Sequence, residues 1–228
     1  MADEALCAGS PPHRGGPLST VLVIDTALNA CQAGLFRGGD VIISATDPMP
    51  RGHQERLPVM VAELFREAGL APRDVTDIGV TLGPGSFTGL RVGLSFAKGL
   101  ASGLGLALKG VGTLEVLTAH PDLAGREVLA VINGGRGSFY VQHGQNAPQA
   151  IGFADLAKLS DIRLLTGPAV NEVKSEFPDA EVVLQDWPSL PALAGLTLMP
   201  GHDDLTPLYM RGADAVASTR GIITLVPA

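Results

Sequence analysis

The segment of this chain best suited to chemistry is residues 83–91, with the sequence GPGSFTGLR. Glycines and hydroxyl residues in front of a helix can hold phosphate, because free backbone N–H groups point at the ligand there. The lysine of a Walker A loop is missing, and Thr88 stands where the dinucleotide fingerprint has its third glycine. Residue chemistry alone therefore favours a structural role, in which Ser86 or Thr88 caps a helix, over an anion site on the same N–H groups.

Asp25 is the best acidic candidate, because it ends the apolar run VLVID, where a strand-end carboxylate would face a cleft and orient a water or a metal ion. The corresponding position in the second half of the chain is Asn133, which Gly134 and Gly135 follow. The pair of carboxylates needed for acid–base or magnesium chemistry is therefore incomplete. The sequence predicts a degenerate cleft that contains Asp25, Asn133, Gly134 and Gly135 and carries no cofactor.

Metal and nucleophile patterns are also incomplete. A metal pair on a helix needs histidines four residues apart, and Leu57 stands four residues after His53, so no metal site is predicted. Ser86 lacks the G-x-S-x-G frame of a hydrolase nucleophile. The two cysteines, Cys7 and Cys31, cannot form a disulfide framework, and both are expected to be reduced.

The elements around these residues form two similar units. Three strands at 21–25, 30–36 and 41–46 open the chain as a meander, because a turn signal separates the last two. A helical face over 57–68, a strand from 77 and a helix over 89–102 follow them. A weaker copy of the pattern starts with an apolar strand near residue 128. This pattern predicts an α/β protein of two lobes around a cleft.

The predicted division of the chain has four parts. Residues 1–19 are expected to be a disordered extension, residues 20–112 the first lobe, residues 113–205 a second and smaller lobe, and residues 221–228 a tail. Residues 206–220 are expected to be able to pack back on the first lobe.

The two predicted helices carry more apolar surface than one buried face needs. A row of small residues four apart, Gly89, Gly93, Ala97 and Ala101, lets another helix approach closely. A core helix and a helix shared with a subunit interface both fit this pattern. The interface hypothesis assigns contacts to His53, Leu57, Met60, Val61, Leu64, Gly89, Val92, Gly93, Phe96, Ala97 and Leu100.

Composition excludes several classes of protein. The 228 residues carry a net charge of −7, with 46% hydrophobic and 17% charged residues. Such a chain is too apolar for a disordered protein and too acidic to bind nucleic acid tightly by itself. No apolar run approaches the ~20 residues of a membrane helix, and residues 1–19 lack the pattern of a signal peptide. We therefore expect a cytoplasmic protein with no membrane contact.

Six segments together resemble the bacterial TsaB (YeaZ) family. They are IDTALNACQAGLF, HQERLP, GPGSFTGLRVGLSFAKGLA, KGVGTLEVL, AVINGGRGSFYV and TPLYMRGADA, which extend from about residue 21 to residue 214. GPGSFTGLR before a small-residue helix is the specific signal among them. The resemblance implies two ribonuclease-H-like lobes of the actin, Hsp70 and sugar-kinase (ASKHA) type.

The same resemblance implies a role in making threonylcarbamoyladenosine beside the tRNA anticodon. In that family TsaB is the non-catalytic partner of TsaD, which carries the metal-binding histidines and transfers the threonylcarbamoyl group from threonylcarbamoyl-AMP. The ATPase TsaE joins the pair, and TsaB alone forms a homodimer. For this chain the resemblance thus implies a non-enzymatic subunit that contacts tRNA only weakly or indirectly.

Three alternatives remain at this stage. An ATP-dependent kinase of the same fold would need a glycine-rich adenosine site, and residues 165–168 offer one glycine. A protease would need a nucleophile–base or metal pair. A binding module acting elsewhere is compatible with the composition.

Overall fold

The computed structural model describes residues 19–210 and contains two five-stranded sheets. The first sheet consists of β1 (Thr20–Asp25), β2 (Ala30–Arg37), β3 (Asp40–Pro48), β4 (Asp77–Thr81) and β5 (Leu108–Val111). Its order is β3-β2-β1-β4-β5, in which β1 pairs antiparallel with β2 and parallel with β4. The predicted meander is confirmed, and its last turn uses the positive φ angles of Gly38 and Gly39.

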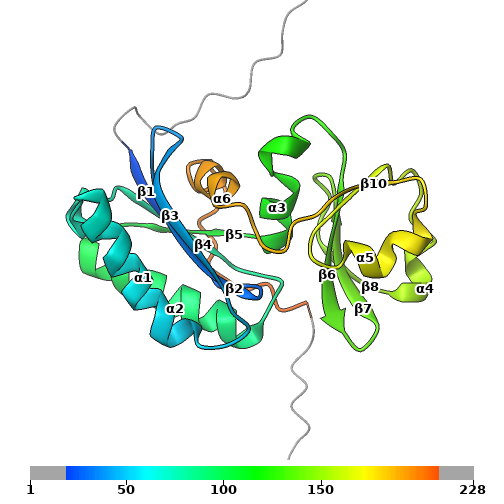
Figure 1. The fold of residues 1–228 in the computed structure, drawn as a ribbon, viewed down its shortest axis with the longest axis horizontal. Coiled ribbons are helices and arrows are strands. Elements are labelled where there is room, and N and C mark those ends of the chain that lie inside the picture. Colours follow the sequence, from blue (N-terminus) through cyan, green and yellow to red (C-terminus); the bar gives the residue numbers. More distant parts are fainter. Residues whose placement is uncertain (1–18, 211–228) are drawn as a thin grey trace, which may run out of the picture.

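The second sheet repeats the topology of the first. It consists of β6 (Leu129–Gly135), β7 (Ser138–His143), β8 (Gln149–Gly152), β9 (Leu164–Thr166) and β10 (Glu181–Val183), in the order β10-β9-β6-β7-β8. If β6 to β10 are matched with β1 to β5, the two orders are the same. The predicted fold class, two similar α/β lobes of the ribonuclease-H type, is confirmed (Figure 1).

Helices cover both faces of the first sheet (Figure 1). α1 (His53–Ala68) and α2 (Phe87–Leu104) lie on one face, and α6 (Leu190–Thr197) lies on the other. Shorter helical segments complete the chain: η1 (Pro72–Asp74), α3 (Thr113–Thr118), η2 (Pro121–Leu123), α4 (Phe153–Leu156), α5 (Val170–Val173) and η3 (Lys174–Glu176). Within residues 19–210, no helix is both long and apolar enough to cross a membrane.

The apolar face of α1 packs against the first sheet. Leu57, Met60, Val61, Leu64 and Phe65 are all buried in the core of the first lobe. The helix ends where the sequence predicts, because Gly69 takes the left-handed conformation that terminates it.

The small-residue row of α2 faces the interior of its own lobe. A Cβ atom at Gly89 would lie 2.1 Å from the backbone oxygen of Thr26, and one at Gly93 would lie 2.4 Å from Thr26 Oγ1. The hydroxyl of Thr26 also donates a hydrogen bond to the backbone oxygen of Gly89 at 2.7 Å. Ala97 and Ala101 are buried in the same core. The row therefore lets α2 approach the turn after β1, which is the core alternative of the sequence analysis.

The region expected to form the second lobe also contributes to the first. The range 113–205 includes α6, but α6 packs on β1 and β4, and a Cβ atom at Gly79 of β4 would lie 1.9 Å from Thr197 Oγ1. Further along, the N–H of Leu208 donates to the backbone oxygen of Leu82 at 2.8 Å. Residues 206–210 thus follow the first lobe, while residues 1–18 and 211–228 lie outside the described part of the chain.

The close approach of α2 leads to a stability prediction. Gly93→Ala should lower the free energy of unfolding by about 1–3 kcal/mol, because the added methyl group collides with Thr26. Gly99→Ala is the matched control on the same helix, since a Cβ atom there meets nothing within 4 Å. It should raise the same free energy by ~0.5–1 kcal/mol through helix propensity. Urea denaturation of both variants measures the difference, and equal effects would contradict the assigned orientation of α2.

Candidate functional site

The candidate site is a cleft of about 1000 Å³ between the two lobes. The first lobe contributes the turn after β1, the loop before α2 and the last described residues of the chain. The second lobe contributes the end of β6 and the loops that follow β9 and β10. The lining residues are Ala27, Leu28, Asn29, Pro84, Gly85, Ser86, Phe87, Ile132, Asn133, Gly134, Gly135, Tyr140, Pro168, Glu172, Asp186, Leu208, Tyr209 and Met210.

Three of the predicted cleft residues line it. Asn133, Gly134 and Gly135 form its wall at the end of β6. The Asn133 amide donates to Glu172 Oε2 at 2.6 Å, and its Oδ1 accepts the N–H of Gly135 at 2.6 Å. Asn133 is therefore held by its own lobe, and it brings the carboxylate of Glu172 to the cleft.

Asp25 does not face the cleft, contrary to the prediction. Its side chain is fully buried in the first lobe. Thr81 Oγ1 donates to Asp25 Oδ1 at 2.6 Å, Gln32 Nε2 donates to Oδ2 at 2.9 Å, and the N–H of Ala27 donates to Oδ1 at 3.1 Å. These donors come from β4, β2 and the turn after β1, so the carboxylate links three segments of the first lobe.

Burial also changes the acidity of this carboxyl group. Desolvation raises the pKa of Asp25 above its ordinary 3.8, while the hydrogen bonds from Thr81, Gln32 and Ala27 and the nearby charge of His53 lower it. The net direction is upward.

The glycine-rich loop before α2 makes hydrogen bonds and close contacts with other parts of the first lobe. Ser86 caps α2, because its hydroxyl accepts the N–H of Gly89 at 3.2 Å, and the N–H of Ser86 donates to the backbone oxygen of Ala27 at 2.7 Å. A Cβ atom at Gly85 would lie 2.2 Å from that same oxygen. The predicted structural cap is confirmed. The N–H groups of Ser86 and Ala27 both bind within the protein, which leaves neither to hold phosphate.

The sequence analysis did not identify two carboxylates that line the cleft. Glu172 lies on α5 and Asp186 in the segment after β10, and both are exposed and line the cleft. Lobe symmetry is the signal that could have found Glu172. Gly167-Pro168 lies between β9 and α5 as Gly83-Pro84 lies between β4 and α2. Among residues 19–210, the lining contains no lysine or arginine, so the charge of this described part disfavours a polyphosphate ligand.

Aromatic side chains mark one rim of the cleft. The rings of Phe87 and Tyr209 are tilted by 45° to one another with their centroids 5.2 Å apart, and the guanidinium of Arg91 lies 3.8 Å from the centre of the Phe87 ring. Phe87 and Tyr209 are 53% and 44% exposed, which is high for such large apolar groups. This cluster is the second feature that the sequence did not reveal, because residues 87 and 209 meet only in the fold.

Phe87 also belongs to a groove of about 490 Å³ between α1 and α2. The groove is lined by Gln54, Leu57, Pro58, Phe87, Thr88, Arg91, Val92, Ser95 and Phe96. Val59, which follows the lining residue Pro58 on α1, is 51% exposed. An apolar groove with exposed apolar neighbours is typical of an interaction surface.

The predicted interface residues divide into two groups. Only Val92, Phe96 and Leu100 keep part of their side chains accessible. The others are buried in the first lobe, and a charge at Gly93 or Ala97 would therefore disrupt the core before it affected any partner. The buried group consists of His53, Leu57, Met60, Val61, Leu64, Gly89, Gly93 and Ala97.

Metal ligands are not brought together in the part of the chain that the structure describes. No three histidine, cysteine, aspartate or glutamate side chains between residues 19 and 210 gather to hold an ion. Leu57, four residues after His53, packs in the core, and Cys31 is buried as a free thiol.

Comparison with known proteins points to one group. The family described as TsaD, tRNA N6-adenosine threonylcarbamoyltransferase, matches residues 48–179, which is more than half of the chain. The tRNA threonylcarbamoyladenosine biosynthesis protein TsaB of Escherichia coli is 29% identical in an alignment that covers 82% of this chain and 84% of that protein. TsaB of Bacillus subtilis is 28% identical and covers 90% of this chain and 79% of its own length.

A solved structure agrees with these relatives. YeaZ from Pseudomonas aeruginosa superposes with a TM-score of 0.66 at 25% identity, over 78% of this chain and 90% of that one. The similarity therefore extends over both lobes and the cleft between them.

The buried carboxyl group gives a prediction for pH. The folded protein holds the proton of Asp25 more tightly than the unfolded chain does, because its pKa is raised. The contribution of Asp25 to the free energy of unfolding should therefore fall as the pH rises from about 4 through the raised pKa. Asp25→Asn cannot ionise and should lack this fall.

Urea denaturation of both proteins between pH 4 and pH 8 measures the effect. Asp40→Asn, on the exposed hairpin, is the matched control and should follow the wild type. Parallel curves for the wild type and Asp25→Asn would refute the upward direction of the pKa.

Proposed function

We propose that this chain, which belongs to the TsaB (YeaZ) group within the TsaD family, is a subunit of the machinery that makes threonylcarbamoyladenosine in tRNA. Its proposed role is to bind and activate a catalytic TsaD subunit, which transfers the threonylcarbamoyl group from threonylcarbamoyl-AMP to the adenosine beside the anticodon. The observation that carries the proposal is the similarity to TsaB proteins over most of the chain.

The cleft supports a non-catalytic role for this subunit. Its candidate acid, Asp25, is committed to Thr81 and Gln32 inside the first lobe. The N–H groups of Ala27 and Ser86 bind Asp25 and the Ala27 oxygen rather than facing a ligand. A kinase of this fold would need such groups free to hold phosphate, so the structure offers no specific observation in favour of that alternative.

The proposed partner surface is the groove between α1 and α2, including Val92 and Phe96, together with exposed Val59. We assign this surface to TsaD in the complex and to a second copy when the chain is alone. The same residues serve both assemblies, so the two contacts exclude one another.

The further proposals are that TsaE joins the pair, that tRNA contacts this acidic subunit weakly or indirectly, and that the complex works in the cytoplasm.

Reconstitution tests the role in tRNA modification. A TsaC-type enzyme, TsaD and TsaE are incubated with tRNA, ATP, threonine and bicarbonate, with or without this chain, and the nucleosides are quantified by mass spectrometry. Omitting the chain should lower the yield of threonylcarbamoyladenosine by at least about tenfold, as expected when a partner activates the catalytic subunit. Equal yields would overturn the proposed function.

Substitutions in the groove test the partner surface. Ser95→Glu and Phe96→Glu place a charge against apolar groove walls and should each weaken TsaD binding by at least about tenfold. Ser102→Glu, exposed on α2 outside the groove, should bind as the wild type does. Titration calorimetry measures the affinities, and thermal unfolding shows that each variant is folded.

Ser95 is exposed, so Ser95→Glu keeps the test valid if Phe96→Glu unfolds the lobe. Wild-type affinity of a folded Ser95→Glu protein would remove the groove from the interface.

A further inference from the structure

The described chain crosses between the two sheets at two places. The first crossing runs from the end of β5 at Val111 to the start of β6 at Leu129 and contains α3. The second runs from the end of β10 at Val183 to α6, which packs on the first sheet (Figure 1). Residues 184–189 of this second crossing are called the strap below. Any movement of one lobe against the other must bend both crossings.

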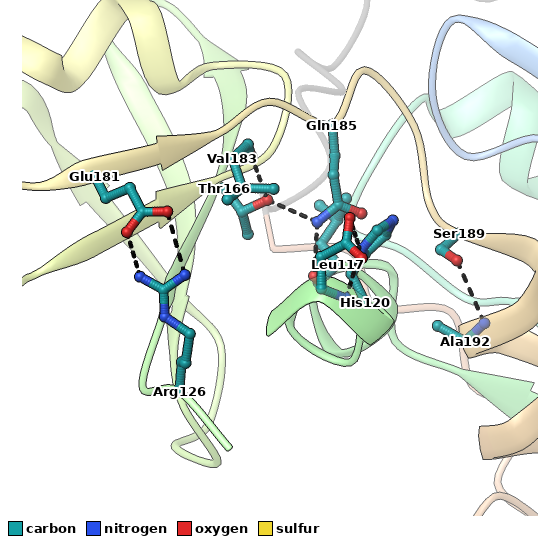
Figure 2. Close-up of polar contacts among 10 residues, drawn as sticks. Leu117, His120, Arg126, Thr166, Glu181, Val183, Gln185, Ser189 and Ala192 are labelled. Atoms are coloured by element: carbon teal, nitrogen blue, oxygen red, sulfur yellow. Dashed lines mark hydrogen bonds and ion pairs between the residues drawn. The ribbon is translucent and has the colours of Figure 1, made fainter. Parts of the chain in front are cut away.

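Gln185 fastens the strap to the second lobe and to the other crossing (Figure 2). Its buried amide donates to Thr166 Oγ1 at 2.7 Å and to the backbone oxygen of Leu117 at 3.0 Å. Thr166 belongs to β9 and Leu117 to α3. Thr166 in turn donates to the backbone oxygen of Val183 at 2.8 Å, just before the strap. One side chain thus joins the strap, the second sheet and α3.

Gln32 fastens the other end of the strap to the first lobe. Its buried amide donates to the backbone oxygen of Pro188 at 3.2 Å and to Asp25 Oδ2 at 2.9 Å. Its Oε1 accepts the hydroxyl of Thr46 at 3.0 Å. Because Asp25 also binds Thr81 and the N–H of Ala27, the strap is connected to β1, β2, β3 and β4 through one polar network.

Further contacts hold the chain on both sides of the strap. Arg126 makes a two-pronged ion pair with Glu181 at the start of β10, and the Ser189 hydroxyl accepts the N–H of Ala192 at 3.4 Å and caps α6 (Figure 2). Buried amides that lose hydrogen-bond partners are costly, so moving the strap would take from Gln185 its acceptors on Thr166 and Leu117 and from Gln32 its acceptor on Pro188.

We propose that the strap, clamped by Gln185 on the second lobe and by Gln32 on the first, locks the two lobes in one relative orientation. In this reading Asp25 belongs to the lock, which explains why its carboxylate points away from the cleft. A locked pair of lobes keeps the cleft at one width and presents the helix groove and the cleft rim with fixed geometry. The proposal does not depend on which partner binds the groove.

Distances between spin labels test the lock. Labels are attached to cysteines introduced by Ser102→Cys in the first lobe and Gln145→Cys in the second, both exposed positions, in a Cys7→Ser background. Cys31 is buried and stays in place. The parent protein should show one narrow distance distribution. Gln185→Met and Gln32→Met, which keep the length of the side chain but remove its donors, should each broaden it about twofold.

Trp187 gives a second readout, because it is the only tryptophan of the chain and lies in the strap. Quenching of its fluorescence by acrylamide should rise about twofold in both methionine variants, as the released strap opens locally. Ser44→Ala is the matched control. Ser44 lines the same surface hollow as the strap and makes no hydrogen bond to it, so neither readout should change.

The two clamps differ in their risk to folding. Gln32→Met removes a partner from buried Asp25, whereas Gln185→Met leaves the hydrogen bonds of Asp25 intact. Circular dichroism shows which variants are folded. A folded Gln185→Met protein with the parent's narrow distance distribution and quenching would overturn the lock, even if Gln32→Met failed to fold.

Discussion

The first lobe depends on the close approach of α2 to the turn after β1. Gly85, Gly89 and Gly93 stand four residues apart, and a Cβ atom at any of them would enter the space of Thr26 or Ala27. Because the glycines allow this close approach, the N–H of Ser86 can donate to the backbone oxygen of Ala27, and the hydroxyl of Thr26 can donate to the backbone oxygen of Gly89. A helix with side chains at these positions would stand further from the sheet, and the turn could not be held in this way.

This contact also decides what the cleft can do. In the turn after β1, the Thr26 hydroxyl binds α2 and the N–H of Ala27 binds Asp25, while Asn29 lines the cleft together with apolar side chains and the exposed carboxylates of Glu172 and Asp186. Asp25 in turn connects β1, β2 and β4 and, through Gln32, the segment that leads to α6. The polar groups of Asp25, Thr81 and Gln32 bind one another inside the first lobe, and the proposed non-catalytic role draws on this arrangement.

The low share of charged residues has two physical explanations in the fold. Part of the apolar surface of α1 and α2 is buried in the core, where Leu57, Met60 and Ala97 are fully buried. The remaining part, around Val59, Phe87 and the groove between the helices, stays exposed. Exposed apolar patches of this kind are costly in an isolated chain and are typical of surfaces that a partner covers.

The sequence by itself indicated an α/β fold of two lobes, the strand meander, the two main helices, a helix cap at Ser86 or Thr88 and the cleft residues Asn133, Gly134 and Gly135. These follow from local spacing, because periodicity fixes which residues share a face. Spacing does not say what that face meets. Only the tertiary structure decided that Gly89 and Gly93 face Thr26 rather than a second helix, and that α6 covers the first sheet. It also decided that Asp25 turns inward, because its partner Thr81 lies 56 residues further along the chain.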